Sequence, residues 1–263
     1  MKISLLVLCA LIVADTSWAQ DWAKQRLEKS PRHHEWVELK SSNGPVKGFI
    51  VYPEVKTKAP AVLIVHEIFG LTDWAMELAD EVAAAGYIAI VPDLLSAPDG
   101  KDSQSYPDQE AAIKAVSALK PAQVFPDLDA AADYVAKLPA CDGMVAVAGF
   151  CRGGDWAFRY ADHNPKLKAA YIFYGIGPQK KEEGDKIACP VYGFYGENDA
   201  RVGATIPQTK EIMQSLGKTF EPVIYKDAGH GFMRAGEAPD ASPANHKARD
   251  DAWMRWKSLL EKL

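Results

Sequence analysis

The sequence has no excess of positive charge, no internal repeat and no residue cluster with the spacing of metal ligands. Its 30 basic and 35 acidic residues give a net charge of −5. Without a basic stripe, we do not expect nucleic acid or another polyanion as a partner, and we expect neither a metal nor a cofactor. What the chain does have is a 48% hydrophobic fraction over 263 residues. That composition is ample for one large core and suits a single α/β domain.

The N-terminus predicts a secretory signal peptide over residues 1–19. Lys2 provides a positive start, residues 3–14 are mostly apolar, and small residues stand three positions and one position before the expected cleavage point. The apolar run is too short to span a membrane and no stop-transfer pattern follows, so we expect no stable membrane insertion. Residues 20–263 would form one exported domain, periplasmic or secreted, which we expect to be a monomer.

Cysteine is scarce, and three cysteines follow the predicted cleavage point: Cys141, Cys151 and Cys189. Cys141 and Cys189 precede two predicted strands, and a third strand at residues 169–174 should lie between these two. Two strand steps correspond to roughly 9–10 Å, which is beyond the reach of a disulfide. We therefore expect both to be buried and free, with a disulfide as the less favoured alternative.

The most informative segment is Gly149-Phe150-Cys151-Arg152-Gly153. It follows the apolar run 144–148 and precedes sequence compatible with a helix, which is the arrangement of the nucleophile elbow of an α/β-hydrolase, here with cysteine in place of the usual serine. So tight a turn leaves no room for a β-carbon at the flanking positions and strains the nucleophile. The helix N-terminus beneath the thiol would favour the thiolate. The alternative is a buried structural cysteine.

Two further residues have the positions that this chemistry needs. Asp199 follows the predicted strand 190–196, and His230 follows the last predicted strand, 220–225. The chain order Cys151, Asp199, His230 is the nucleophile, acid and base order of α/β-hydrolases, with each residue on a loop after the C-terminal end of a strand. Each residue alone could be a solvated acid or a loop histidine, but together they predict a catalytic triad.

Strands and helices alternate along the sequence, which predicts an α/β fold with a mostly parallel, eight-stranded twisted sheet and helices on both faces. The predicted strands span residues 37–40, 46–52, 62–66, 87–91, 144–148, 169–174, 190–196 and 220–225. The predicted helices span residues 74–85, 108–119, 128–138, 155–162 and 207–216, and a last helix starts with Ser242 as its N-cap. No insertion is large enough for a cap domain. The segment 96–109, rich in Pro, Gly, Asp and Ser, is the expected mobile loop over the site.

Four motifs in combination give the sequence a family resemblance. They are the His-Glu-Ile-Phe-Gly turn at residues 66–70, Gly-Phe-Cys-x-Gly-Gly at 149–154, Gly-Glu-Asn-Asp at 196–199 and His-Gly-Phe-x-Arg at 230–234. With these motifs the chain resembles the dienelactone hydrolase family from about Val37 to Leu263. The resemblance implies an α/β-hydrolase fold and hydrolysis of a carboxylic ester or lactone. The backbone N–H groups of Ile68 and Arg152 are the expected oxyanion hole.

The same resemblance implies roles for two charged residues. Glu67 would control the thiol, interacting with Cys151 and taking its proton when substrate arrives. Arg234 would bind a substrate carboxylate. The family's second carboxylate-binding arginine has no counterpart between residues 96 and 119, where this sequence has lysines and a lone tyrosine. We therefore expect an ester or lactone substrate, leave open whether it carries a carboxylate, and take dienelactone only as the family's example.

Two functions other than hydrolysis remain open from the sequence. An acyltransferase would use the same acyl-cysteine but would need an acceptor alcohol to outcompete water. A non-catalytic binding protein could have the scaffold of a hydrolase, because a fold does not prove an activity. The complete triad with Glu67 favours a hydrolase. We expect His66 to orient the turn that carries Glu67, with a contact to substrate as the less favoured alternative, and Asp93 to be a structural loop acid.

Overall fold

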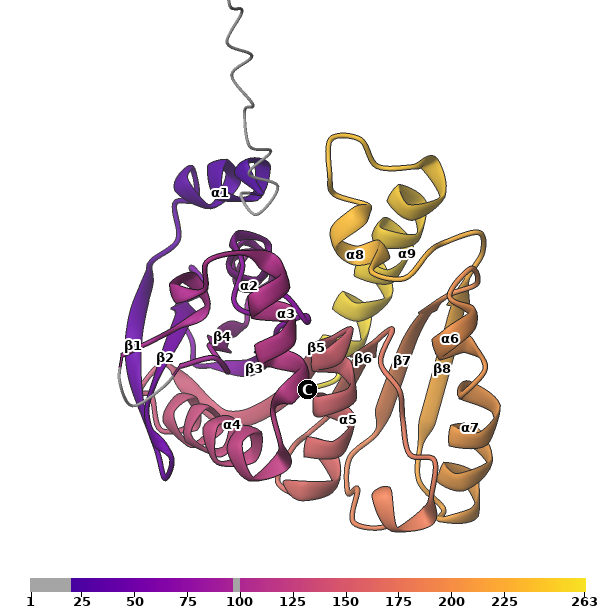
Figure 1. Ribbon diagram of the computed structural model, residues 1–263. Coiled ribbons are helices and arrows are strands. Elements are labelled where there is room, and N and C mark those ends of the chain that lie inside the picture. The colour runs from indigo at the N-terminus through magenta and orange to yellow at the C-terminus, as the bar shows by residue number, and fades with distance from the viewer. Residues whose placement is uncertain (1–19, 97–99) are drawn as a thin grey trace, which may run out of the picture.

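One sheet of eight strands runs through the molecule in the order β1-β2-β4-β3-β5-β6-β7-β8 (Figure 1). The computed structural model describes residues 20–96 and 100–263, so the predicted signal peptide lies outside the described residues. The strands are β1 (His34–Ser41), β2 (Gly44–Val51), β3 (Ala59–Val65), β4 (Ile88–Pro92), β5 (Cys141–Phe150), β6 (Ala170–Phe173), β7 (Val191–Gly196) and β8 (Phe220–Tyr225). β2 pairs antiparallel with β1 and β4, and all other pairings are parallel. The predicted mostly parallel, eight-stranded sheet is confirmed.

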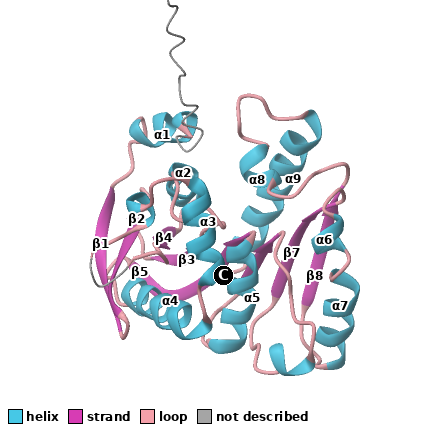
Figure 2. Ribbon diagram, viewed as in Figure 1, coloured by secondary structure: helices cyan, strands magenta, loops and turns pink. Residues whose placement is uncertain are grey.

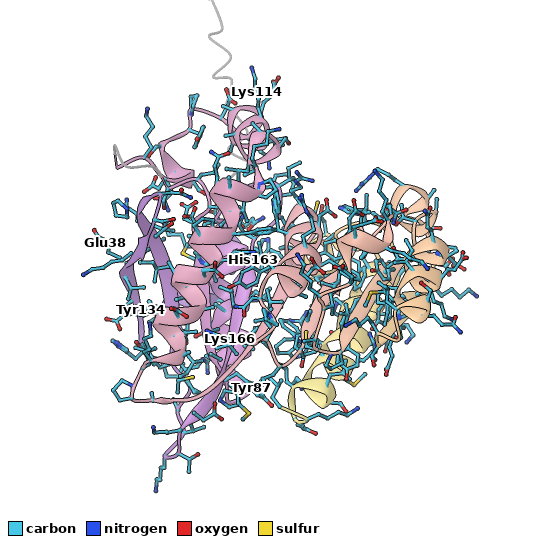
Figure 3. All side chains as sticks on the ribbon, turned by 90° about the horizontal axis from the view of Figure 1, so that it is seen from below. Glu38, Tyr87, Lys114, Tyr134, His163 and Lys166 are labelled. Carbon is cyan, nitrogen blue, oxygen red and sulfur yellow. The ribbon has the colours of Figure 1, made fainter. Side chains whose placement is uncertain are left out.

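Helices cover both faces of this sheet (Figure 2). The helices are α1 (Asp21–Glu28), α2 (Asp73–Ala84), α3 (Gln109–Ala118), α4 (Pro121–Ala136), α5 (Arg152–His163), α6 (Ala200–Gly203), α7 (Ile206–Ser215), α8 (Phe232–Ala235) and α9 (Pro243–Leu260), with short 3-10 helices η1 (Ser103–Ser105) and η2 (Lys181–Glu183). One core contains side chains of α1, α2, α8 and α9, and the core on the other face contains side chains of α4, α5 and α7. Figure 3 labels Tyr134 of α4 and His163 of α5 in this second helical layer.

Strand β3 shows why the centre of the sheet is apolar on both sides. Val62 and Ile64 belong to the core under α2 and α9, whereas Leu63 and Val65 belong to the core under α4 and α5. Successive side chains of a strand point to opposite faces, so a strand covered on both faces must be apolar at every position. Burying each such side chain contributes about 1.5–3 kcal/mol. The continuous apolar run predicted a strand for this reason.

The C-terminal helix α9 begins and packs as the sequence predicts. The Ser242 hydroxyl accepts a hydrogen bond from a backbone N–H of the first turn, at 3.2 Å. Trp256 and Leu260 are buried in the core, and Trp253 and Leu263 pack against it as partly buried side chains. The apolar face of this helix therefore stabilises the fold rather than binding a ligand.

Four helices differ from the prediction, because the short helices α6 and α8 are not predicted and α1 and α4 depart from it as well. Helix α1 has no predicted counterpart, because its pattern is weak: only Ala23 and Leu27 of its 8 residues are buried. Helix α4 begins at Pro121, before the predicted start at residue 128. Proline is well suited to the first position of a helix, and the Gln123 side chain accepts a hydrogen bond from the N–H of Lys120. The capping contacts thus start the helix before its apolar pattern becomes clear.

The described cysteines are all free, as the strand order predicts. Cys141 and Cys189 are buried, and no disulfide joins any of the three cysteines in residues 20–96 and 100–263. Strand β6 lies between β5, which begins at Cys141, and β7, which follows Cys189. No large cap domain is inserted among the described strands. Within the same residues, no helix is both long enough and apolar enough to cross a membrane.

Candidate active site

Cys151 occupies a strained turn between β5 and α5. Its φ angle is 54°, in the left-handed region that a residue with a β-carbon rarely adopts. A β-carbon on Gly149 would lie 2.1 Å from the carbonyl oxygen of Gly153, and a β-carbon on Gly153 would lie 2.1 Å from that of Val65. The two glycines are therefore required for the close approach of α5 to β5 and β3. This is the tight turn that the sequence predicts.

Three loops at the C-terminal ends of β5, β7 and β8 bring Cys151, Asp199 and His230 together. His230 Nε2 lies 3.1 Å from Cys151 Sγ, and His230 Nδ1 lies 2.5 Å from Asp199 Oδ2. Asp199 is only 7% exposed, and its second oxygen accepts a hydrogen bond from the N–H of Val202. These partners assign the proton of the neutral imidazole to Nδ1. Nε2 is then able to accept the proton of the thiol.

The thiol of Cys151 is protonated in the resting state. Burial raises the pKa of Cys151 to about 11, and the charge of Glu67 contributes to the rise. Hydrogen bonds from the backbone N–H groups of Arg152 and Ile68 oppose it. The N–H of Arg152 at the helix N-terminus favours the thiolate, as expected, but burial and the like charge of Glu67 outweigh it. The same two N–H groups converge beside the sulfur, where they can receive an oxyanion.

Glu67 is held beside the thiol by two other side chains. It is buried, its Oε2 accepts a hydrogen bond from Arg234 Nε at 2.6 Å, and its Oε1 accepts one from the Tyr174 hydroxyl at 3.3 Å. The Arg234 guanidinium also lies 4.9 Å from the ring centroid of Phe69, within the range of a cation–π interaction. Among the described side chains, Cys151 Sγ makes its hydrogen bond with His230 and not with Glu67. Glu67 therefore acts on the resting thiol through its charge.

His66 and Asp93 anchor the loops around the site. Leu94 N–H donates to Nε2 of the buried His66, so Nδ1 carries the proton and donates to the Glu67 carbonyl oxygen at 2.8 Å. Burial lowers the pKa of His66, which keeps the ring neutral. Asp93 accepts hydrogen bonds from the backbone N–H and the hydroxyl of Ser103, at 2.7 and 2.6 Å. Both residues have the structural roles that we expected.

Two residues that shape the site were missed from the sequence. Tyr174 follows β6 with a φ angle of 44°, and its ring meets that of His230 edge-on, with centroids 5.1 Å apart. Burial raises the pKa of Tyr174 well above its usual value, so its hydroxyl stays protonated and donates to Glu67. Its position directly after a strand was a usable signal. Ser103 accepts a hydrogen bond from the N–H of Leu71 at 2.8 Å. No sequence pattern pointed to this residue.

The sheet order, the cysteine on a strained strand-to-helix turn, and the histidine and aspartate on later loops are those of an α/β-hydrolase. The sequence profile of the dienelactone hydrolase family matches residues 46–263. The chain therefore belongs to the dienelactone hydrolase family, and it is a carboxylic ester hydrolase.

Similar proteins agree with this assignment. A protein of Methylorubrum extorquens named "Putative carboxymethylenebutenolidase" is 33% identical over 232 residues, which cover 83% of this chain and 77% of that protein. A protein of the same name from Yersinia pestis is 30% identical over 235 residues, which cover 82% of this chain and 84% of that protein. A crystal structure described as a "Putative Dienelactone Hydrolase" from Klebsiella pneumoniae superposes with a TM-score of 0.76 at 27% identity, covering 88% of this chain and 99% of that one.

Proposed function

We propose that the protein hydrolyses carboxylic ester or lactone bonds through a covalent acyl-cysteine on Cys151. His230 is the general base and acid, and Asp199 orients its imidazole. The observation that carries this proposal is the continuous hydrogen-bonded line from Sγ through the imidazole to the carboxylate. The resting thiol is neutral, so the proton leaves it only when the nucleophile attacks.

The reaction has two halves. Cys151 Sγ attacks the carbonyl carbon while its proton moves to His230 Nε2, and the N–H groups of Ile68 and Arg152 stabilise the oxyanion. The carbon–oxygen bond then breaks, and His230 returns the proton to the leaving alkoxide. Water attacks the thioester, again with His230 as base, and releases the acid and the thiol. Each oxyanion donor contributes about 2.7–4 kcal/mol in comparable sites.

Arg234 and Glu67 support a more specific proposal, that the preferred substrate carries a carboxylate. Arg234 holds Glu67 Oε2 at 2.6 Å, so a substrate carboxylate that docks on the same guanidinium competes with Glu67. The released Glu67 would then accept the thiol proton in place of His230 and return it to the sulfur when the acyl-cysteine is hydrolysed, while the leaving alkoxide takes its proton from water. This is the substrate-assisted activation that the family resemblance implies. Such activation leaves the thiol neutral without substrate, and a neutral thiol resists oxidation.

Hydrolysis is favoured over acyl transfer because water reaches the base. The His230 side chain is 33% exposed, so the acyl-cysteine is not shielded from solvent. The test is a panel of aryl esters, lactones and thioesters, each with and without a distal carboxylate, given to the wild type and to Cys151→Ala. We expect the variant to lose at least about 10³-fold in kcat with an unchanged circular dichroism spectrum. Retained turnover in a folded variant, or products formed only with an added alcohol, would contradict the proposal.

We also propose that residues 1–19 are removed on export. Gln20 begins the described chain with contacts of its own: its backbone carbonyl accepts hydrogen bonds from the N–H groups of Ala23 and Lys24, and its side chain accepts one from Trp74 N–H at 2.8 Å. Cleavage before Gln20 leaves these contacts intact. The intact mass of the protein secreted by a bacterial host should correspond to residues 20–263. A retained leader would contradict the proposal.

A further inference from the structure

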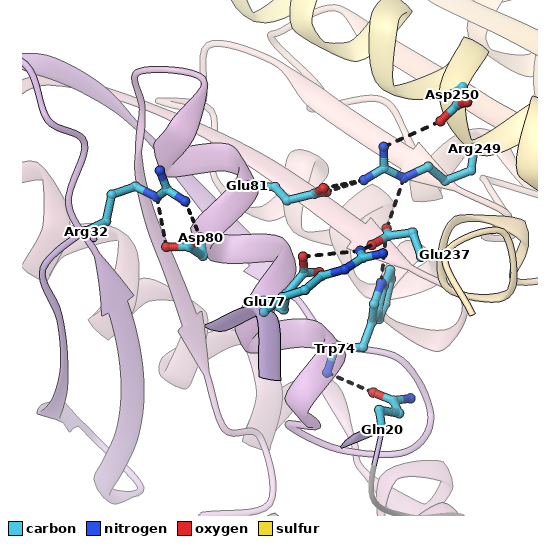
Figure 4. A network of polar contacts seen from close by, with 10 residues as sticks. Gln20, Arg32, Trp74, Glu77, Asp80, Glu81, Glu237, Arg249 and Asp250 are labelled. Atoms are coloured by element: carbon cyan, nitrogen blue, oxygen red, sulfur yellow. Dashed lines mark hydrogen bonds and ion pairs between the residues drawn. The ribbon is translucent and has the colours of Figure 1, made fainter. Parts of the chain in front are cut away.

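Three carboxylates, two of them buried and one partly buried, gather between α2, the segment after α8, and α9 (Figure 4). We call Glu77, Glu81 and Glu237 the carboxylate cluster. One oxygen of each lies within 4.8 Å of the others. Glu77 and Glu81 are one turn apart on α2, which places them on the same face of that helix. No residue of the cluster belongs to the catalytic site.

Two arginines partly neutralise the carboxylate cluster. Arg249 Nε lies 3.1 Å from Glu237 Oε1, and its Nη2 binds Glu81. Arg26 Nη1 lies 2.9 Å from Glu237 Oε2 and 3.6 Å from Glu77 Oε1. Two guanidinium groups therefore face three carboxylates, so one negative charge is not matched.

Glu77 is the residue left without a close partner. Its side chain is only 5% exposed, and within the described residues its Oε2 is buried without any hydrogen bond. A buried carboxyl oxygen without a partner is costly.

We propose that the carboxylate cluster is a binding site for a divalent cation, calcium in particular, and that the cation takes the place of the Arg26 guanidinium. Carboxylate oxygens are hard ligands that suit calcium, magnesium and manganese. A cavity of about 430 Å³ borders the cluster and offers room for bound water. Calcium accepts irregular sets of carboxylates and waters, whereas magnesium demands near-ideal octahedral geometry. Calcium is therefore the best fit.

Arg26 is the partner that can leave. Its side chain is 50% exposed, whereas that of Arg249 is 11% exposed. The guanidinium of Arg26 can therefore turn into solvent when a divalent cation replaces it beside Glu77 and Glu237. Asp250 and His246 also border the cavity, and Asp250 Oδ1 lies 3.7 Å from Arg249 Nη1. The departure of Arg26 would leave Arg249 as the cation that faces the cluster from α9.

A cation bound to the carboxylate cluster would stabilise the segments that carry Glu67 and Arg234, although it would lie outside the active site. Helix α2 follows the turn that carries Glu67, and the N–H of Glu237 donates to the carbonyl oxygen of Arg234 at 3.2 Å. The carboxylate cluster thus joins the two segments whose ends form the Glu67–Arg234 ion pair. We expect a bound cation to raise the stability of the fold rather than to take part in ester hydrolysis.

The test is calcium binding to the purified, chelator-treated protein. Isothermal titration calorimetry measures the affinity, and thermal unfolding measures the change in Tm. We expect one site per chain with a Kd on the order of 10⁻⁴ M. At 10 mM calcium, Tm should rise by about 5 °C, and magnesium should raise it less. Arg26→Ala removes the competing guanidinium and should tighten calcium binding about two- to fivefold.

Matched variants separate this site from general charge effects. Glu77→Gln should abolish the calorimetric signal and the rise in Tm. Glu211→Gln, which removes the same charge from an exposed position of α7, should keep both. The absence of binding to the wild type, an equal response of the two Gln variants, or unchanged binding by Arg26→Ala would overturn the proposal. Neither readout depends on catalysis, so failure here leaves the proposed function intact.

Discussion

The active site and the carboxylate cluster both bury charged side chains, but they balance charge differently. In the active site each carboxylate has its own partner: Asp199 binds His230, and Glu67 binds Arg234. In the carboxylate cluster three carboxylates share Arg249 and Arg26, and Glu77 makes no hydrogen bond within the described residues. The active site has matched pairs, whereas the cluster has surplus negative charge.

The difference in charge balance determines what each group of side chains can do. A one-to-one pair holds a side chain in a single geometry, which catalysis requires because the imidazole must face both the thiol and the carboxylate. A surplus of buried negative charge destabilises the fold unless a proton or cation compensates it. We therefore expect substitutions in the active site to change turnover, and substitutions in the carboxylate cluster to change stability.

The largest expected effect is that of Asp199→Asn. The amide would donate a hydrogen bond toward Nδ1 and favour the wrong tautomer of His230, so kcat should fall about 10³- to 10⁴-fold. Tm should stay within a few degrees of the wild type. Steady-state kinetics with an aryl ester and thermal unfolding measure the two quantities. A loss of less than tenfold would show that the imidazole is oriented by something other than Asp199.

Arg249→Met tests the expectation that substitutions in the carboxylate cluster change stability rather than turnover. It would leave Glu81 and Glu237 without their buried guanidinium, and breaking such a network by removing one partner costs about 3 kcal/mol. The free energy of unfolding, measured by urea denaturation, should fall by that amount. Turnover of the folded enzyme should remain within about twofold of the wild type. A tenfold loss of kcat with unchanged stability would mean that the cluster is part of the catalytic apparatus.

The sequence predicted the sheet and the arrangement around Cys151 because both depend on local patterns. A strand buried on both faces needs a continuous apolar run, as β3 has, and the elbow needs glycines that the chain displays in order. Asp199 and His230 could be found because each follows a strand, and parallel strands end at the same edge of the sheet. Each of these sequence patterns lies within a few residues of the side chain or strand that it predicts.

The remaining features depend on pairs of residues far apart in the chain. The sequence shows Glu77 and Glu81 one turn apart, but not that Glu237 and Arg249 pack against them. It also could not show that Glu67 binds Arg234 and that burial raises the pKa of Cys151. Burial and long-range pairing come from tertiary packing, which local composition does not encode.

Arg234→Ala tests whether the ion pair of the active site also recognises substrate. A charge-assisted contact to a substrate carboxylate contributes about 1.5–3 kcal/mol, so kcat/KM for esters that carry a carboxylate should fall about ten- to a hundredfold. The lower end is expected, because the Arg234 side chain is 29% exposed and solvent screens its charge. Neutral esters of the same size should lose much less.

Kinetics on matched pairs of charged and neutral esters provide the measurement. Equal losses on both would show that Arg234 serves only to hold Glu67 and the loop of His230. The substrate would then need no carboxylate, and the ester hydrolase assignment would stand without it.

The smallest expected effect is that of Glu67→Gln on the thiol itself. The Glu67 charge helps to raise the pKa of Cys151 to about 11, so removing that charge should lower the pKa and increase the thiolate fraction at pH 8. Each pKa unit changes that fraction about tenfold, and we expect alkylation by iodoacetamide at pH 8 to become about three- to tenfold faster. Glutamine can still accept the hydrogen bond of Arg234 with its amide oxygen, and its NH2 group can donate to the Tyr174 hydroxyl. The fold should therefore persist, while turnover falls because the second proton acceptor is lost. Glu77→Gln is the matched control, since it removes a buried carboxyl from the carboxylate cluster and should leave alkylation unchanged. If both variants alkylate at the wild-type rate, the raised pKa comes from burial alone, and Glu67 has no electrostatic control over the nucleophile.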